Sequence, residues 1–257
     1  MLSERDVAAV VSRMSSLDII PAPIPQDHRS RYFWLQQLEN TDVADSLCRG
    51  KFSSQELYCK VHSLFVSSRL AFGLLSAVDV MKYIREFWYE QPFKPQYRAN
   101  ASFGQKMEPP AISLYHTLTR KIVKRCKNVI NPKIPFLIAS PVGLVFDRGN
   151  LVKAIEIKTI TEMTSYDEIG LVRCCVQTRF GLQLKRHTST YSQMQFTMLC
   201  LNLDQMDLVL YFPKLQQIEV VSVKRDTFFL NTCLPKLYHN YVHHLIPYLV
   251  SKINELE

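Results

Sequence analysis

The sequence predicts an α/β protein in which a sheet-containing core carries helical additions. Apolar residues recur at helical spacing through much of the first 95 residues. After "NPKIP" the pattern changes to that of strands, and helical spacing returns in residues 233–257. The 257 residues are enough for one sizeable core. We expect one compact unit with a helical N-terminal region, residues 1–95, and a main domain, residues 96–257.

Three segments of the N-terminal region have the apolar spacing of helices. They are residues 7–14, 56–75 and 78–89. The proline-rich "PAPIPQD" at residues 21–27 separates the first segment from the others, because proline removes a backbone donor and fixes φ. The region is therefore predicted to be mainly helical.

A loop and a long helix are predicted next. Residues 91–104, "QPFKPQYRANASFG", have the composition of a loop. Residues 109–130 have helical spacing, with two prolines in the first turn, where their missing N–H groups cost little. We expect this helix to end in a basic cluster. The cluster comprises Arg120, Lys121, Lys124, Arg125 and Lys127.

The second half of the chain is rich in predicted strands. These are residues 136–146, 151–160, 171–177, 206–212 and 217–226. Residues 189–203 have helical spacing, and residues 233–257 are predicted to form a final helix or helix pair. This order of elements supports the α/β prediction.

The first two of these strand regions are expected to contain a hairpin. If Arg148–Asn150 is a three-residue turn whose central glycine takes a positive φ, then Asp147 faces Leu151. The same register places Val142 opposite Glu156, so the side chains at these two positions are expected to be neighbours.

Glu156 and Lys158 point to one face of this hairpin, while Ile155 and Ile157 point to the core, because side chains alternate along a strand. A charge inside an apolar strand is costly to bury unless something compensates it. The Glu156 carboxylate and the carbonyl of Ile157 offer hard oxygen ligands for Mg²⁺, and a lysine one step further can position or activate water. This spacing suits phosphodiester hydrolysis, although it also occurs by chance on solvated strands.

Six short motifs follow one another in an informative order. They are "FGQKMEPPAISLY", "ASPVGLVF", "AIEIKTI", "LKRHTSTYSQMQFTM", "MDLVLYF" and "VVSVKRD". Together they resemble the signature of the lambda-exonuclease or YqaJ-type nucleases of the PD-(D/E)XK superfamily, over residues 98–250. The resemblance implies a restriction-endonuclease-like core, with a central mixed sheet flanked by helices, around one metal-dependent cleavage site. It does not extend to residues 1–95.

The resemblance also implies roles for individual residues. Glu108 resembles the family's helical metal-site carboxylate, Glu156 resembles the strand carboxylate at the same ion, and Lys158 resembles the catalytic lysine. Either Gln193 or Gln195 resembles the catalytic glutamine of the next helix, since residues two apart on a helix face different ways. The cofactor implied is Mg²⁺ or Mn²⁺. Other roles stay open: an acid at a helix N-terminus for Glu108, and plain polar positions for the glutamines.

Val142 stands where the family's hairpin strand has a metal-binding aspartate. Valine has no lone pair to offer a hard cation. Asp147 cannot substitute, because it lies five residues further along the strand, about 16 Å away, and on the opposite face. Asp167 and Glu168 are candidates only through their closeness in sequence. We expect metal binding to be weak or absent unless another acid completes the site.

Three classes of function are consistent with these observations. The first is a divalent-metal-dependent nuclease of the DNA exonuclease type, with a departed metal site. The second is a catalytically impaired nuclease-fold protein that binds nucleic acid or a protein partner without cutting. The third is a structural interaction module. This class is favoured if the protein shows no salt-dependent affinity for any nucleic acid.

A formal charge of +8 favours a polyanionic partner. The resemblance favours DNA over RNA, and it allows assembly into oligomers. The residues expected to contact nucleic acid are Arg98, Lys121, Lys124, Arg125, Lys185, Arg186 and His187. For residues 185–187 the alternative is an ordinary solvated loop.

Cysteine usage and the N-terminal composition predict an intracellular protein, nuclear or cytoplasmic and not secreted. The seven cysteines form no C-x-x-C pair and lie at no zinc-ligand spacing, as expected for reduced thiols. The first 16 residues carry charges of both signs, unlike a signal peptide. The chain has no apolar run approaching the roughly 18 residues of a membrane span.

Overall fold

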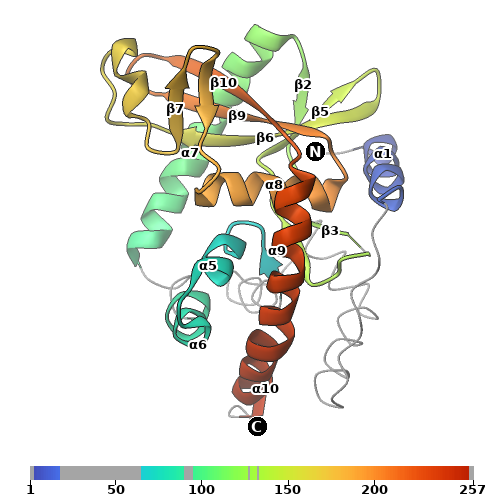
Figure 1. Cartoon of the computed structure of the whole chain (residues 1–257). Helices are drawn as coiled ribbons and strands as arrows, with labels where there is room; N and C mark the ends of the chain where they lie inside the picture. Colours follow the sequence, from blue (N-terminus) through green and yellow to red (C-terminus); the bar gives the residue numbers. More distant parts are fainter. Residues whose placement is uncertain (1–2, 18–64, 90–94, 127, 132, 255–257) are drawn as a thin grey trace.

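The computed structural model describes residues 3–17, 65–89, 95–126, 128–131 and 133–254. Its centre is a five-stranded mixed sheet with the strand order β10-β9-β6-β5-β2 (Figure 1). The strands are β2 (Ile122–Lys124), β5 (Gly143–Asp147), β6 (Asn150–Thr159), β9 (Gln205–Phe212) and β10 (Gln217–Lys224). Strands β6 and β9 run parallel, and the other neighbours run antiparallel. The predicted α/β fold with a central mixed sheet is confirmed.

Helices cover both faces of this sheet. Helix α8 (Ser189–Leu201) packs on one face, and α7 (Pro95–Thr119) packs on the other. The core on the α8 side includes Leu144, Ala154, Met194, Met198, Leu208 and Leu210. The core on the α7 side includes Ala111, Tyr115, Val145, Ile155, Ile157 and Val209. Because β9 is covered on both faces, its sequence from Leu208 to Phe212 is a continuous apolar run.

A long crossover joins β6 to β9, as parallel neighbours require. It contains the 3₁₀-helix η3 (Tyr166–Leu171), the hairpin of β7 (Cys175–Thr178) and β8 (Gly181–Leu184), and then α8. The crossover therefore returns α8 to the face of the sheet to which the Glu156 and Lys158 side chains point.

The remaining elements surround the core. A three-stranded sheet contains β1 (Val66–Ser67), β4 (Leu137–Ala139) and β3 (Val129–Ile130). The N-terminal helices are α1 (Glu4–Ser15), α5 (Ala71–Ser76), α6 (Val80–Tyr83) and the π-helix η1 (Ile84–Tyr89). The C-terminal helices are α9 (Thr227–Asn240), the π-helix η4 (Tyr241–Leu245) and α10 (Ile246–Asn254). Within the described ranges, no helix is long and apolar enough to cross a membrane.

Two predicted elements differ in extent from the structure. The segment predicted as one helix over residues 56–75 contains, in its described part, the short strand β1 followed by α5. The strand predicted over residues 136–146 is divided between β4 and β5, which belong to different sheets, because the intervening Pro141 cannot donate a ladder hydrogen bond. The predicted proline-rich linker at residues 21–27 lies outside the described residues.

The β5–β6 hairpin has a shorter turn than predicted. Arg148 and Gly149 form a two-residue turn with φ values of 50° and 85°, and Asp147 pairs with Asn150 rather than with Leu151. A β-bulge between Val145 and Phe146 then shifts the register by one residue. The shorter turn and the bulge displace the pairing in opposite directions. The predicted register therefore holds from the Val145–Lys153 pair to the Gly143–Ile155 pair.

Helix α7 corrects two predictions. It begins at Pro95, so most of the predicted loop at residues 91–104 is helical, and both prolines lie inside the helix. The helix continues through them because its C-terminal half is anchored on the sheet by the buried side chains of Ala111 and Tyr115. It ends at Thr119, before Arg120 with φ 58°. The β-branched pair that follows forms β2, so the basic cluster does not lie on one helix.

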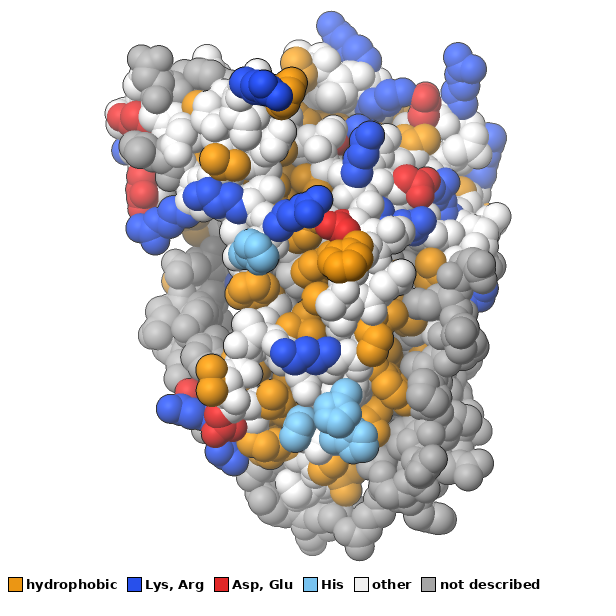
Figure 2. Space-filling model, in the orientation of Figure 1, with side chains coloured by type: hydrophobic (Ala, Val, Ile, Leu, Met, Phe, Trp, Pro, Cys, Tyr) orange, Lys and Arg blue, Asp and Glu red, His pale blue; other side chains and the backbone are white. Residues whose placement is uncertain are grey.

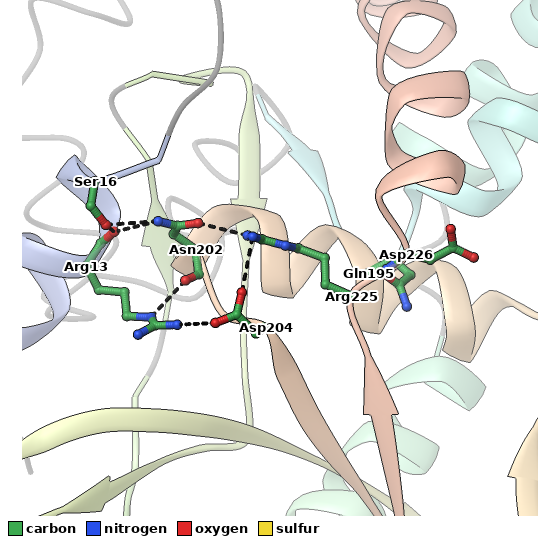
Figure 3. A network of polar contacts seen from close by, with 7 residues as sticks. All are labelled: Arg13, Ser16, Gln195, Asn202, Asp204, Arg225 and Asp226. Atoms are coloured by element: carbon green, nitrogen blue, oxygen red, sulfur yellow. Dashed lines mark hydrogen bonds and ion pairs between the residues drawn. The ribbon is translucent and has the colours of Figure 1, made fainter.

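A polar network fastens α1 to the end of α8 (Figure 3). Arg13 Nε donates a hydrogen bond to the Asn202 carbonyl (2.8 Å), and the Asn202 amide donates to the Arg13 carbonyl (3.2 Å) and to Ser16 Oγ (2.9 Å). The Asp204 carboxylate lies 2.9 Å from the Arg13 guanidinium and 3.2 Å from that of Arg225. Helix α1 is thereby joined to the open end of the β9–β10 hairpin, where Asp204 precedes β9 and Arg225 follows β10.

A second link between α1 and the sheet predicts a loss of stability in acid. Lys124 Nζ lies 2.7 Å from both carboxylate oxygens of the buried Asp6. Burial raises the pKa of Asp6, but hydrogen bonds from Lys124 and Ser3 outweigh it and lower the pKa from 3.8 to about 2. A carboxyl group whose pKa is lower in the folded than in the unfolded protein stabilises the fold at pH values above its unfolded pKa. This contribution, about 2 kcal/mol, is lost as the pH falls from about 4 to about 2.

Urea unfolding of the parent protein and Asp6→Asn between pH 2 and pH 7 measures this contribution. We expect the difference in free energy of unfolding between the two proteins to be constant above pH 5 and to shrink below pH 4. A difference that does not change with pH would contradict the assignment.

Candidate active site

Glu156 and Lys158 form an ion pair near the C-terminal end of β6. Lys158 Nζ lies 2.7 Å from Glu156 Oε1, and both side chains point to the α8 face of the sheet because they are two residues apart. The Glu156 side chain is 7% exposed and the Lys158 side chain is 33% exposed. The pair therefore has a buried carboxylate and an ammonium group that solvent or a ligand can reach.

Gln193 completes this constellation from α8. Its Oε1 lies 3.3 Å from Lys158 Nζ. The helix is positioned by its N-cap, where Thr188 Oγ1 accepts a hydrogen bond from the backbone N–H of Tyr191 (3.2 Å). Lys158 is thus held between an acid of its own strand and an amide from the crossover helix.

Gln195 faces away from this pair and has a different environment. Its amide donates to the Lys224 carbonyl (2.9 Å) and accepts from the backbone N–H of Asp226 (2.7 Å), and the side chain is fully buried. These bonds hold the junction between β10 and α9, where Figure 3 shows Gln195 beside Asp226. Of the two glutamines, only Gln193 contacts the Glu156–Lys158 pair.

Glu108 lies in the middle of α7 rather than at a helix N-terminus, so a macrodipole role for it is wrong. Its carboxylate lies 3.2 Å from the Arg125 guanidinium, and its side chain is 24% exposed. Burial raises the pKa of Glu108, the Arg125 charge opposes this effect, and the Glu156 charge adds to it. The charge of Glu156 thus acts against the ionised form of Glu108, an effect that a cation between the two would relieve.

The donors at this place suit a hard divalent cation in kind, but they are few. Glu108 and Glu156 supply carboxylate oxygens, and the carbonyl of Ile157 is the third donor expected from the sequence. Each carboxylate already has a cationic partner. In the part of the chain that the structure describes, no three His, Cys, Asp or Glu side chains are grouped as metal ligands.

Val142 lies at a bend one residue before β5. The β5–β6 ladder ends at the Gly143–Ile155 pair, in the predicted register, so Val142 is one step beyond it. The side chain is partly buried and packs against the α7-side core. Continuing the register would place Val142 opposite Glu156.

The other acids considered for the site have separate roles. Asp147 forms an ion pair with Lys121 (2.7 Å) at the opposite end of β5. Glu168 accepts a hydrogen bond from the backbone N–H of Thr164 (3.0 Å). The side chain of Asp167 lies outside the described part of the structure.

All three predicted nucleic-acid contacts near β2 have acidic partners within the chain. Besides the Lys121–Asp147 pair, Lys124 is bound to Asp6 and Arg125 to Glu108. Lys185, Arg186 and His187 are exposed immediately before α8, and the Arg186 guanidinium lies 3.7 Å from the Asp226 carboxylate. Arg98 lies in the first part of α7, and its side chain is not described.

Two groups near the site were not identified from the sequence. Asp207 is buried on the α7 face, where it binds Tyr115 Oη (2.7 Å), Lys153 Nζ (3.0 Å) and Ser222 Oγ (2.5 Å). An acid inside the apolar run "MDLVLYF" is the same signal that revealed Glu156. The second group is Cys174. Its hydrogen bond with the adjacent Cys175 lowers its pKa to about 7, burial opposes this effect, and the Lys158 and Lys185 charges assist it.

A comparison with protein families matches residues 72–200 to the YqaJ-like viral recombinase domain. This match covers just over half of the 257 residues, and it begins at residue 72, so the likeness reaches into the region of residues 1–95, where none was expected. The chain belongs to the YqaJ-like viral recombinase family. The matched residues of this YqaJ-like protein include Glu108, Val142, Glu156, Lys158 and Gln193.

Solved exonuclease structures share the fold of this YqaJ-like protein. An alkaline exonuclease from Laribacter hongkongensis is 22% identical to this chain, with a TM-score of 0.55. Its complex with dAMP is 24% identical, with a TM-score of 0.56. Both alignments cover 79% of this chain and 100% of the exonuclease chain. A phage related exonuclease from Haemophilus somnus is 18% identical, with a TM-score of 0.50, covering 76% and 97% of the two chains. No curated protein matches. The PD-(D/E)XK-like fold expected from the sequence is confirmed.

Proposed function

We propose that this protein is a divalent-metal-dependent nuclease that hydrolyses phosphodiester bonds in DNA. The observation that carries the proposal is the Glu156–Lys158–Gln193 constellation, in which a partly exposed ammonium group is held 2.7 Å from a buried carboxylate and 3.3 Å from an amide. The family match and the likeness to two exonucleases support the same reaction class. The dAMP complex of one relative supports DNA over RNA and attack from an end.

Each residue of the constellation has a distinct role in this proposal. Lys158 holds the attacking water and offsets the charge that develops on the phosphate. Gln193 keeps the lysine side chain directed toward the site through the contact between Oε1 and Nζ. Glu156 and Glu108 would hold Mg²⁺ or Mn²⁺ together with the Ile157 carbonyl. When bound there, the ion supplies positive charge beside the phosphate and lowers the pKa of water.

A second candidate function is binding of nucleic acid or a protein partner without cleavage. It is favoured by the small number of acidic ligands and by Val142, which stands at the position where the family resemblance leads us to expect an aspartate. The assembly of several copies stays a prediction in either case.

The experiment that tests the proposal is a cleavage assay with Mg²⁺ or Mn²⁺ on linear duplex DNA, single-stranded DNA and RNA. We expect metal-dependent loss of the DNA substrates, with mononucleotides as products of attack from an end. A chelator is the control, because it removes the cation without changing the protein. Binding of these substrates without cleavage under any of the conditions would leave the second candidate.

Metal binding can be measured independently of cleavage through thermal stability. An ion that binds the native state alone raises the melting temperature in proportion to the logarithm of its concentration once the site is filled. We expect Mn²⁺ to stabilise the parent protein, and Glu108→Gln to remove most of the shift. The control is Asp147→Asn, because this exposed acid lies at the far end of β5. An equal shift in all three proteins would place the ion elsewhere.

A further inference from the structure

The β7–β8 hairpin in the crossover ends in a well-defined tip. Thr178 pairs with Gly181, and the two residues between them are Arg179 and Phe180. Thr178 Oγ1 accepts the backbone N–H of Phe180 (3.1 Å) and donates to the Gly181 carbonyl (2.8 Å), while Gly181 takes a φ of 97°. These bonds fix the backbone of the turn, so the side chains of Arg179 and Phe180 are presented on a rigid support.

Phe180 is exposed at this tip in a way that its own fold does not explain. The residue is 76% exposed, although burying a phenylalanine is worth about 2 kcal/mol or more. The Arg179 guanidinium lies over the ring, with its carbon 4.6 Å from the ring centroid. The tip therefore offers an aromatic ring and a cation side by side, the combination on which nucleobases stack and phosphates bind.

The base of the hairpin adjoins the candidate active site. Cys175, Leu182 and Leu184 pack into the α8-side core, and β8 lies alongside β10 (Figure 1). β8 leads through residues 185–188 into α8, which carries Gln193 and through it contacts Lys158. The hairpin is thus a projection that begins beside the Glu156–Lys158 pair and carries Phe180 outward from it.

Positive charge surrounds the hairpin. Arg173, Arg179 and Lys185 are exposed, and among the described residues none of the three has an ion-pair partner. Arg186 follows in the segment before α8. Figure 2 shows most of the Lys and Arg side chains of this face on its upper half, over the central sheet and the hairpins. A polyanion is the partner that this charge fits.

We propose that the β7–β8 hairpin binds single-stranded nucleic acid next to the active site, with Phe180 stacked on a base and Arg179 and Lys185 on the phosphates. This inference rests on the proposed function, since it names where the substrate strand lies. The base must be unpaired at the tip, because bases inside a duplex are covered on both faces by their neighbours. The hairpin would therefore engage a frayed end or a single strand rather than an intact duplex.

Fluorescence anisotropy with a labelled oligodeoxynucleotide and a blunt duplex, both in chelator to prevent cleavage, tests this inference. We expect Phe180→Ala to weaken single-strand binding between about fivefold and a hundredfold, and to weaken duplex binding less. Phe180→Trp should keep the single-strand affinity of the parent protein, because tryptophan keeps the aromatic surface. Val78→Ala is the control, since Val78 is a fully exposed apolar residue between α5 and α6.

The outcomes separate this inference from the proposed function. Single-strand binding by the parent protein with no loss in Phe180→Ala would overturn the role of the hairpin and leave the nuclease proposal intact. Absence of nucleic-acid binding by the parent protein would overturn both. If Phe180→Ala changes the oligomeric state in gel filtration and leaves single-strand affinity unchanged, the tip contacts a second copy of the chain, and the inference is wrong.

Discussion

Replacement of Lys158 by alanine is expected to lower cleavage by about 10²–10⁴-fold while nucleic-acid affinity stays within a few-fold of the parent value. In the proposed mechanism the ammonium group acts on the attacking water and on charge that develops only in the transition state, so its loss should affect the rate far more than binding. Glu156→Gln should have a similar effect, because it removes the charge of the buried carboxylate while keeping its shape. Single-turnover cleavage rates and binding measured in chelator provide the two quantities.

The chain offers a matched control on the same strand. Lys153 also forms an ion pair with a buried carboxylate, that of Asp207, but it points to the α7 face of the sheet. Lys153→Ala should destabilise the fold by leaving Asp207 with one partner fewer, and the folded protein should keep its cleavage rate. Equal losses of rate in the Lys153 and Lys158 variants, measured well below their melting temperatures, would show that the loss in the Lys158 variant is not specific to the candidate active site.

Val142→Asp is expected to create or raise Mg²⁺-dependent cleavage and to strengthen Mg²⁺ binding at least about tenfold. Val142 lies one residue beyond the β5–β6 ladder, and its side chain packs against the same core as Met107, the neighbour of Glu108 in α7. Glu156 points to the α8 face whereas Val142 packs on the α7 side, so a carboxylate introduced there completes the site only if it turns toward Glu156 and Glu108. Without metal the variant should be less stable than the parent, by about 1–3 kcal/mol, because a charge replaces a partly buried apolar side chain.

Val142→Asn is the control for this substitution, because asparagine has the shape of aspartate without its charge. It should share the loss of stability and gain neither metal affinity nor activity. Isothermal titration with Mg²⁺ and the cleavage assay distinguish the two variants. A folded Val142→Asp protein with parental metal affinity would show that Glu108 and Glu156 do not converge on this position.

The sequence was sufficient for the parts of the fold and site that depend on local spacing. Alternation along β6 predicts that Glu156 and Lys158 share a face, and the structure has them 2.7 Å apart. The hairpin register was predicted correctly at the Gly143–Ile155 pair, although for an incomplete reason. A two-residue turn and a bulge displace the pairing in opposite directions, and no residue pattern announced the bulge.

Features that depend on distant partners could not be predicted in this way. Lys124 and Arg125 were assigned to nucleic acid because basic residues cluster there, yet they bind Asp6 and Glu108. The first of these contacts joins residues 118 positions apart in the chain. The choice between Gln193 and Gln195 likewise depended on the neighbouring elements, since β10 and α9 supply the groups that bind the second glutamine.

The network that fastens α1 also bears on the order in which the protein is assembled during synthesis. Arg13 meets its partners Asn202 and Asp204 across 189 and 191 positions of the chain. The ribosome therefore releases α1 long before the residues that receive it, and the apolar side chains of Val10 and Met14 stay without their core until then. Contacts of such long range slow folding, so we expect the first helix to dock late, and until then its segment exposes apolar side chains that chaperones can bind.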